Sequence, residues 1–291
     1  MGNLVTSLLY QPPTPTYVST NPHLVWLETS GEAKIPAFYI NRGASVTMLF
    51  SHGNAEDIGM LYDWFVTFTQ NLGVNVMCYD YEGYGRSEGS KVHNPENVPN
   101  EQSCYEDIDA AWNYLTNTLG KDPSSIVIYG RSLGSGPSCY LAERLSQEKV
   151  KVAALVLQSP ISSVFRVAFD FRFTMPGDMF CNVDRMPNMR MRVLVIHGTK
   201  DEIVPFGNGE QLFLACPAKY RAVPYWCENA GHNDVESFTA NNVEFFDKLS
   251  AFLKQHVESY HDFEGGASPE AVAEDEEEGW LGSLWSLVGA Q

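Results

Sequence analysis

The feature that most constrains the fold of this chain is an alternation of short apolar runs with segments of helical spacing between residues 23 and 256. Uniformly apolar strands that alternate with helices pack as a mostly parallel sheet covered on both faces, so an α/β fold is predicted. The predicted strands cover residues 46–50, 74–79, 125–129, 153–157 and 193–196, with a weaker strand at 222–227. The predicted helices cover residues 58–72, 104–119, 138–145, 209–215 and 243–256. The runs at 24–27 and 37–40 are interpreted as an antiparallel edge of the sheet.

Composition narrows the class of protein further. Hydrophobic residues make up 44% of the 291 residues, so the chain can bury the core that one α/β domain needs. The formal net charge is −17, and without a dense basic surface to neutralise phosphates we expect no nucleic-acid partner. The six cysteines lack the spacing of metal ligands, and we expect neither a metal nor a cofactor. The start of the chain lacks the features of a secretory signal, so the cysteines are expected to be reduced thiols.

The sharpest chemical signal is the sequence Gly130-Arg131-Ser132-Leu133-Gly134, which lies between a predicted strand and a predicted helix. A serine on a sharp strand-to-helix turn adopts a strained backbone, and glycines two residues away on either side avoid a clash. The turn also places amides and the positive end of the helix dipole beside the serine. This context is typical of a nucleophile elbow, so Ser132 is predicted to be a nucleophile.

A serine nucleophile needs a base, and the base needs a carboxylate that orients it. After an elbow of this kind the acid precedes the histidine in the chain. Asp201 and His232 each follow a predicted strand, so both are expected at the same sheet edge as the serine. Glu202 is the runner-up for the acid, and Asp234 is a rival that lies too near the histidine in sequence. His197 is interpreted as a structural loop residue.

The loop at residues 50–55 follows the first strong strand, and hydrolases of this plan donate one oxyanion-hole amide from that loop. We assign this donor to the backbone amide of Asn54, with Ala55 as the alternative. The second donor is expected to be the backbone amide of Leu133. Two amides that point at the developing negative charge are each worth ~3 kcal/mol.

Together, five motifs occur in order along the chain. They cover residues 51–55, 79–85, 130–134, 197–201 and 231–234. This set resembles the α/β-hydrolase superfamily and, more narrowly, the α/β-hydrolase-domain 17 group of acyl-protein thioesterases. The resemblance implies a serine hydrolase with nucleophile Ser132, acid Asp201 and base His232. It also implies removal of long-chain acyl groups, such as palmitate, from S-acylated cysteines of membrane-associated proteins. The chain departs from the group in two places. The group's leader is rich in cysteines that become lipidated, whereas no cysteine precedes Cys78 here, and the acidic tail with its tryptophans is not typical of the group.

Other functions are left open by the same residues. A general carboxylesterase or lipase that acts on small or lipid esters is the nearer alternative, because one triad hydrolyses esters and thioesters alike. A non-catalytic scaffold with a hydrolase fold is a more distant alternative. Such a scaffold would not need the complete set of nucleophile, acid, base and oxyanion loop that this sequence contains. The alternating aromatic residues between positions 165 and 173 form either a half-buried strand or helix edge, or an apolar rim for an acyl chain.

The chain is predicted to have four parts. Residues 1–20 form an extended leader, and residues 21–258 form the α/β-hydrolase catalytic domain. Residues 259–279 form an acidic disordered linker, and residues 280–291 form a short amphipathic apolar segment. Because only residues 159–191 leave room for a cap, little or no lid domain is expected.

The two ends of the chain suggest a contact with a membrane. The first six residues fit the pattern for N-myristoylation of Gly2, and an unmodified start has nearly equal support. One acyl chain binds membranes only marginally, so a second contact is needed. Residues 280–288 either supply that contact, through tryptophans at the lipid interface, or dock onto a protein surface. Docking onto a protein is slightly favoured, because anionic headgroups would repel the adjacent acidic block. We therefore expect a cytoplasmic protein, peripheral on the cytosolic face of a membrane.

Overall fold

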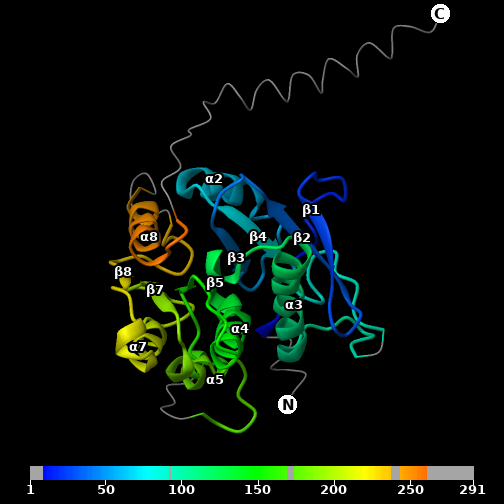
Figure 1. The fold of residues 1–291 in the computed structure, drawn as a ribbon. Coiled ribbons are helices and arrows are strands. Elements are labelled where there is room, and N and C mark those ends of the chain that lie inside the picture. The colour runs from blue at the N-terminus through cyan, green and yellow to red at the C-terminus, as the bar shows by residue number, and fades with distance from the viewer. Residues whose placement is uncertain (1–8, 92, 169–173, 237–242, 261–291) are drawn as a thin grey trace, which may run out of the picture. The chain divides into compact units, whose positions relative to one another are not determined.

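An eight-stranded sheet forms the centre of the computed structural model, which describes residues 9–91, 93–168, 174–236 and 243–260 (Figure 1). The strands are β1 (Leu24–Glu28), β2 (Lys34–Ile40), β3 (Thr47–Ser51), β4 (Asn75–Tyr79), β5 (Ile126–Arg131), β6 (Ala154–Gln158), β7 (Arg192–Gly198) and β8 (Tyr225–Cys227). Their order in the sheet is β1-β2-β4-β3-β5-β6-β7-β8. The pairs from β4 to β8 are parallel, whereas β1 and β2 pair antiparallel at one edge. The predicted fold class and its antiparallel edge are confirmed.

Helices cover both faces of the sheet (Figure 1). The long helices are α2 (Tyr62–Leu72), α3 (Glu101–Asn113), α4 (Ser135–Gln147), α7 (Gly207–Ala215) and α8 (Val243–His256). Buried residues of α3, α4 and α7 share one hydrophobic core, and buried residues of α2 and α8 share the other. Because both faces are covered, every residue of β3, β4 and β6 is buried, which explains why the centre of each strand is apolar without alternation.

Two predicted elements begin three or four residues later in the structure than the sequence predicts. The helix predicted from residue 58 begins at Tyr62, because two carboxylates hold the preceding backbone in a turn. The Ile58 amide donates to Asp80 Oδ1 at 2.9 Å, and the Met60 amide donates to Asp57 Oδ1 at 2.8 Å. The strand predicted from residue 222 is shortened to β8, since Pro224 has no amide proton for the sheet ladder.

The region predicted to hold any cap contains only short helices among the residues that the structure describes. These are α5 (Val164–Ala168) and α6 (Asn182–Arg185), followed by a 3₁₀ turn at Met186–Asn188. The first part of the aromatic run is thus helical rather than a strand, and the rest of that run lies outside the described residues. In the described ranges, no helix is long and apolar enough to cross a bilayer.

The described part of the leader, residues 9–20, packs against the domain. Tyr10 and Tyr17 are buried, and the Tyr17 hydroxyl donates to Asp80 Oδ2. At the other end of the described chain, Tyr260 is also buried against the domain, and its hydroxyl donates to the Leu72 carbonyl at 2.8 Å. Gly2 and residues 261–291 lie outside the described residues, so the predicted boundaries of the leader, linker and terminal segment stay predictions.

Candidate active site

Ser132 occupies a sharp turn at the carboxyl end of β5. It has a φ of 52°, in the left-handed region that non-glycine residues rarely adopt. A 3₁₀ turn at Ser132–Gly134 leads directly into α4. A Cβ on Gly134 would lie 2.1 Å from the Ser51 carbonyl oxygen, so only glycine allows this approach to β3. The strained serine backbone and the close glycine contact are the features expected of a nucleophile elbow.

The structure brings the three predicted triad residues together from separate loops. His232 Nε2 lies 3.0 Å from Ser132 Oγ, and His232 Nδ1 lies 2.7 Å from Asp201 Oδ2. Asp201 follows β7 and His232 follows β8, so all three side chains lie beyond the carboxyl ends of parallel strands. Because the carboxylate can only accept, Nδ1 carries the proton and the Nε2 lone pair faces the serine hydroxyl.

Four N–H groups surround the Asp201 carboxylate. Oδ1 accepts the Ile203 amide at 3.0 Å and the Val204 amide at 2.7 Å, and His197 Nε2 lies 3.2 Å from Oδ2, the oxygen that also faces His232. Burial alone raises the pKa of Asp201, but the hydrogen bonds from both histidines and from the Val204 amide outweigh it and hold the pKa well below its usual range.

His197 is the residue that sequence reasoning missed. It was expected to be a structural loop residue, yet its ring contacts the predicted acid and also the Val204 carbonyl, which lies 2.9 Å from Nε2. Its position four residues before Asp201, at the end of the same strand, is the signal that could have indicated this contact. Of the two adjacent acidic residues, Asp201 contacts the histidine, whereas Glu202 is exposed.

The loop after β3 lies directly beside Ser132, because a Cβ on Gly53 would be 3.6 Å from the serine Cβ. The Gly53 amide donates to Glu56 Oε2 at 2.7 Å, and the Ala55 amide donates to Asn54 Oδ1 at 2.9 Å. The amides of Gly53 and Ala55 are thus occupied by side chains of the same loop. Among the described contacts the amide of Asn54, which lies between them, is the one available to a ligand, and this favours Asn54 over Ala55 as the oxyanion donor.

The Asn54 side chain is itself held in place. Its Oδ1 accepts the Gln11 amide at 2.9 Å and the Tyr84 hydroxyl at 2.7 Å, in addition to the adjacent amide of Ala55. The second predicted donor, Leu133, is buried in the turn that follows the nucleophile. The oxyanion loop is thus anchored by residues from the leader and from the loop after β4.

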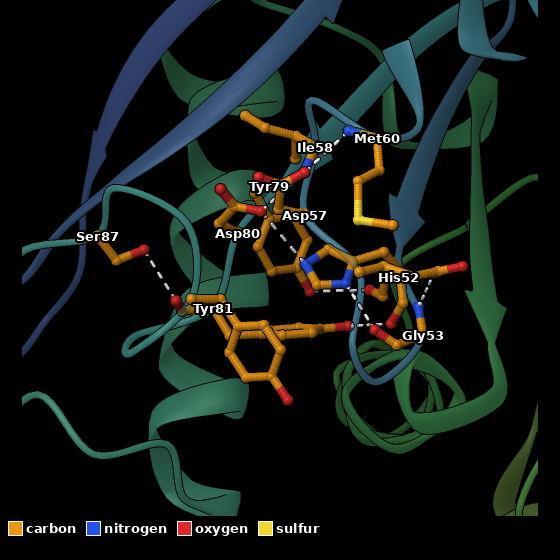
Figure 2. Close-up of polar contacts among 12 residues, drawn as sticks. His52, Gly53, Asp57, Ile58, Met60, Tyr79, Asp80, Tyr81 and Ser87 are labelled. Atoms are coloured by element: carbon orange, nitrogen blue, oxygen red, sulfur yellow. Dashed lines mark hydrogen bonds and ion pairs between the residues drawn. The ribbon is translucent and has the colours of Figure 1, made fainter. Parts of the chain in front are cut away.

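A buried polar cluster supports this loop from behind (Figure 2). His52 is fully buried, with Nδ1 2.8 Å from the Gly53 carbonyl and Nε2 3.5 Å from Asp80 Oδ1. Burial lowers the pKa of His52, but the neighbouring Asp80 carboxylate outweighs burial, so the pKa is raised overall. The Tyr81 hydroxyl donates to the His52 carbonyl at 2.7 Å, and the two rings lie 4.4 Å apart. These contacts leave the loop little freedom to move.

In the described parts of the chain, no group of three His, Cys, Asp or Glu side chains is arranged to hold a metal ion. The hydroxyl, imidazole and carboxylate of the site can relay a proton away from the serine. A strained elbow in a mostly parallel sheet, with this relay beside it, defines a serine hydrolase of the α/β-hydrolase fold.

Comparisons with known proteins agree with that class. The family model described as serine aminopeptidase, S33, matches residues 43–172. The alpha/beta hydrolase domain-containing protein 17B of Homo sapiens is 33% identical over 285 residues, covering 88% of this chain and 92% of that protein. The alpha/beta hydrolase domain-containing protein 17C of Mus musculus is 39% identical over 213 residues, covering 72% of this chain and 60% of that protein. The chain therefore belongs to the alpha/beta hydrolase domain-containing protein 17 family, as the sequence motifs suggested.

Solved structures support the fold independently. The Pyrococcus furiosus esterase Pf2001 superposes with a TM-score of 0.61 at 17% sequence identity, covering 85% of this chain and 99% of that esterase. At this identity the similarity concerns the fold alone, and it matches the sheet and helix layers described above.

Proposed function

We propose that this protein is a serine hydrolase that cleaves acyl thioesters through an acyl-enzyme intermediate. The observation that carries the proposal is the chain of contacts from Ser132 Oγ to His232 and on to Asp201, at 3.0 and 2.7 Å. The base lies within hydrogen-bonding reach of the hydroxyl, and a buried carboxylate holds the base in the tautomer that can accept a proton.

The proposed reaction has two steps. His232 takes the proton from Ser132 as the serine oxygen attacks the acyl carbon, and the amides of Asn54 and Leu133 stabilise the oxyanion. The tetrahedral intermediate collapses, the bond to the leaving sulfur breaks, and the imidazolium returns the proton to that sulfur. Water then attacks the acyl-serine with the same histidine as base, which releases the carboxylic acid and restores the serine. Asp201 stays ionised throughout and stabilises the imidazolium.

The substrate that we propose is a long-chain acyl group, such as palmitate, on a cysteine of a membrane-associated protein. Membership of the family and the resemblance on which the sequence prediction rested support this choice. The short elements in place of a cap, within the described ranges, are compatible with a substrate carried on another protein. We further propose that the enzyme acts on the cytosolic face of a membrane, as a peripheral protein.

A substrate panel tests this proposal. Purified enzyme is assayed against C8 and C16 acyl thioesters, the matched oxygen esters and an aminoacyl anilide, which covers the peptidase activity named in the family model's description. The proposal expects the highest kcat/KM for the C16 thioester and no turnover by Ser132→Ala. A clear preference for short oxygen esters would instead support a general carboxylesterase, the function suggested by the esterase among the structural neighbours.

A further inference from the structure

Arg131 is the central feature of an ionic cluster beside the elbow. It is the last residue of β5 and directly precedes Ser132, yet only 12% of its side chain is exposed. Its Nη1 lies 2.9 Å from Glu56 Oε1 and 3.8 Å from Glu236 Oε1. Burial lowers the pKa of the guanidinium, but the two carboxylates outweigh burial and raise it overall. The cluster therefore holds one cation between two anions that come from different loops.

One side of this cluster leads to the oxyanion loop. Glu56 uses Oε1 for the guanidinium of Arg131 and Oε2 for the amide of Gly53, at 2.9 and 2.7 Å. Gly53 directly precedes Asn54, the proposed oxyanion donor. A single carboxylate thus connects the arginine to the peptide unit next to the donor, and the glycine lies against Ser132 itself.

The other side leads to the loop that carries the base. Glu236 follows His232 by four residues, and Asn233 Oδ1 lies 3.5 Å from Arg131 Nη2. Glu236 is anchored in turn, because its Oε1 accepts Gln158 Nε2 at 2.8 Å at the end of β6. The guanidinium therefore joins the loop that carries His232 to the oxyanion loop, on the side of the elbow where Ser132 begins.

We infer that Arg131 is a positioning residue, which acts through Glu56 and Glu236 to hold the oxyanion donor and the base in register with Ser132. The inference rests on the proposed function. The planar guanidinium suits this role because it can serve two carboxylates from fixed directions, whereas a lysine ammonium is a flexible point charge. A misplacement of ~1 Å in such a site costs ~10²-fold in rate.

The test compares Arg131→Met and Arg131→Lys with the wild type, and adds Glu56→Gln. A fluorophosphonate probe, taken to completion, counts the active sites in each preparation, and kcat and KM are then measured per active site on an acyl thioester. Arg185→Lys is the matched control, since Arg185 forms a 2.6 Å ion pair with Glu143 between α6 and α4, away from the three catalytic loops. Hydrolysis and labelling by the wild type test the proposed function first and separately.

The inference expects kcat per active site to fall ~10²-fold in Arg131→Met, with KM within ~3-fold of the wild type. Arg131→Lys should recover part of the rate, Glu56→Gln should resemble the lysine variant, and Arg185→Lys should match the wild type. An unchanged kcat per active site, with fewer active sites or a lower Tm, would show a purely structural arginine and overturn the inference. A change confined to KM would also overturn it. If Arg131→Met does not fold, the lysine and Glu56→Gln variants decide.

Discussion

Replacing Asp201 by asparagine is the perturbation whose outcome follows most directly from the geometry. Each carboxylate oxygen faces two N–H groups, from Ile203 and Val204 on one side and from His197 and His232 on the other. An asparagine amide has only one accepting oxygen, so its NH₂ group must point at N–H donors in either orientation. The backbone amides cannot change their role, whereas a neutral histidine can change its tautomer.

The expected result is therefore that the new NH₂ group faces His232 and stabilises the wrong tautomer. His232 Nδ1 then accepts a hydrogen bond from the NH₂ group, so the imidazole carries its own proton on Nε2 instead. An Nε2 that is already protonated cannot take the proton of the Ser132 hydroxyl. By analogy with other triads this change lowers kcat by ~10⁴-fold. That factor corresponds to ~5.5 kcal/mol of lost transition-state stabilisation.

The assay is kcat for Asp201→Asn on an acyl thioester, with a Tm measurement to establish that the variant is folded. Asp109→Asn serves as the matched control, since this carboxylate of α3 also accepts hydrogen bonds, from Tyr140 and Arg144, but lies on a helix rather than in the site. The control should retain wild-type kcat. Turnover by Asp201→Asn within tenfold of the wild type would show that Asp201 does not orient His232, and would move the role of the acid to Glu202.

Two further predictions concern stability. Gly134→Ala should destabilise the fold by ~3 kcal/mol, the upper end of the usual cost of overpacking, because the new Cβ would lie 2.1 Å from the Ser51 carbonyl oxygen. At Gly207 a new Cβ meets nothing within 4 Å, so Gly207→Ala should be neutral or stabilise by ~0.5 to 1 kcal/mol. Urea unfolding of both variants measures these differences. The pKa of Asp201 is lowered in the folded state, so its contribution to stability is present at neutral pH and is lost as the pH falls below ~4, where the unfolded carboxyl takes up a proton. The difference in unfolding free energy between the wild type and Asp201→Asn should fall between pH 5 and pH 2, and a difference independent of pH in that range would contradict the assigned environment.

Local patterns in the sequence predict the sheet, and they single out the three residues that the structure brings together. Apolar strands that alternate with helices leave few topologies, and loops at the carboxyl ends of parallel strands meet at one edge, so Ser132, Asp201 and His232 were expected together. Helix and strand limits were less accurate where a tertiary contact decides them. The turn before α2 is an example, because it depends on the side chains of Asp57 and Asp80.

The supporting contacts of the site were not predicted, because most of them join positions far apart in the chain and one depends on the shape of a turn. Arg131 ends β5, whereas Glu56 and Glu236 come from two separate loops, and no periodicity relates the three residues. The contact of His197 with Asp201 depends on the turn after β7, in which the Asp201 amide donates to the Gly198 carbonyl at 3.3 Å. The ionic cluster around Arg131 therefore follows from the folded geometry rather than from any local motif.

Covalent labelling is the sharpest test that Ser132 is the nucleophile. The intact mass of the protein is measured after reaction with a fluorophosphonate probe, and the modified peptide is mapped. We expect a single adduct on Ser132 in the wild type and an unmodified Ser132→Ala variant. An adduct that persists in Ser132→Ala, or a folded wild type that never reacts, would show that Ser132 is not the nucleophile.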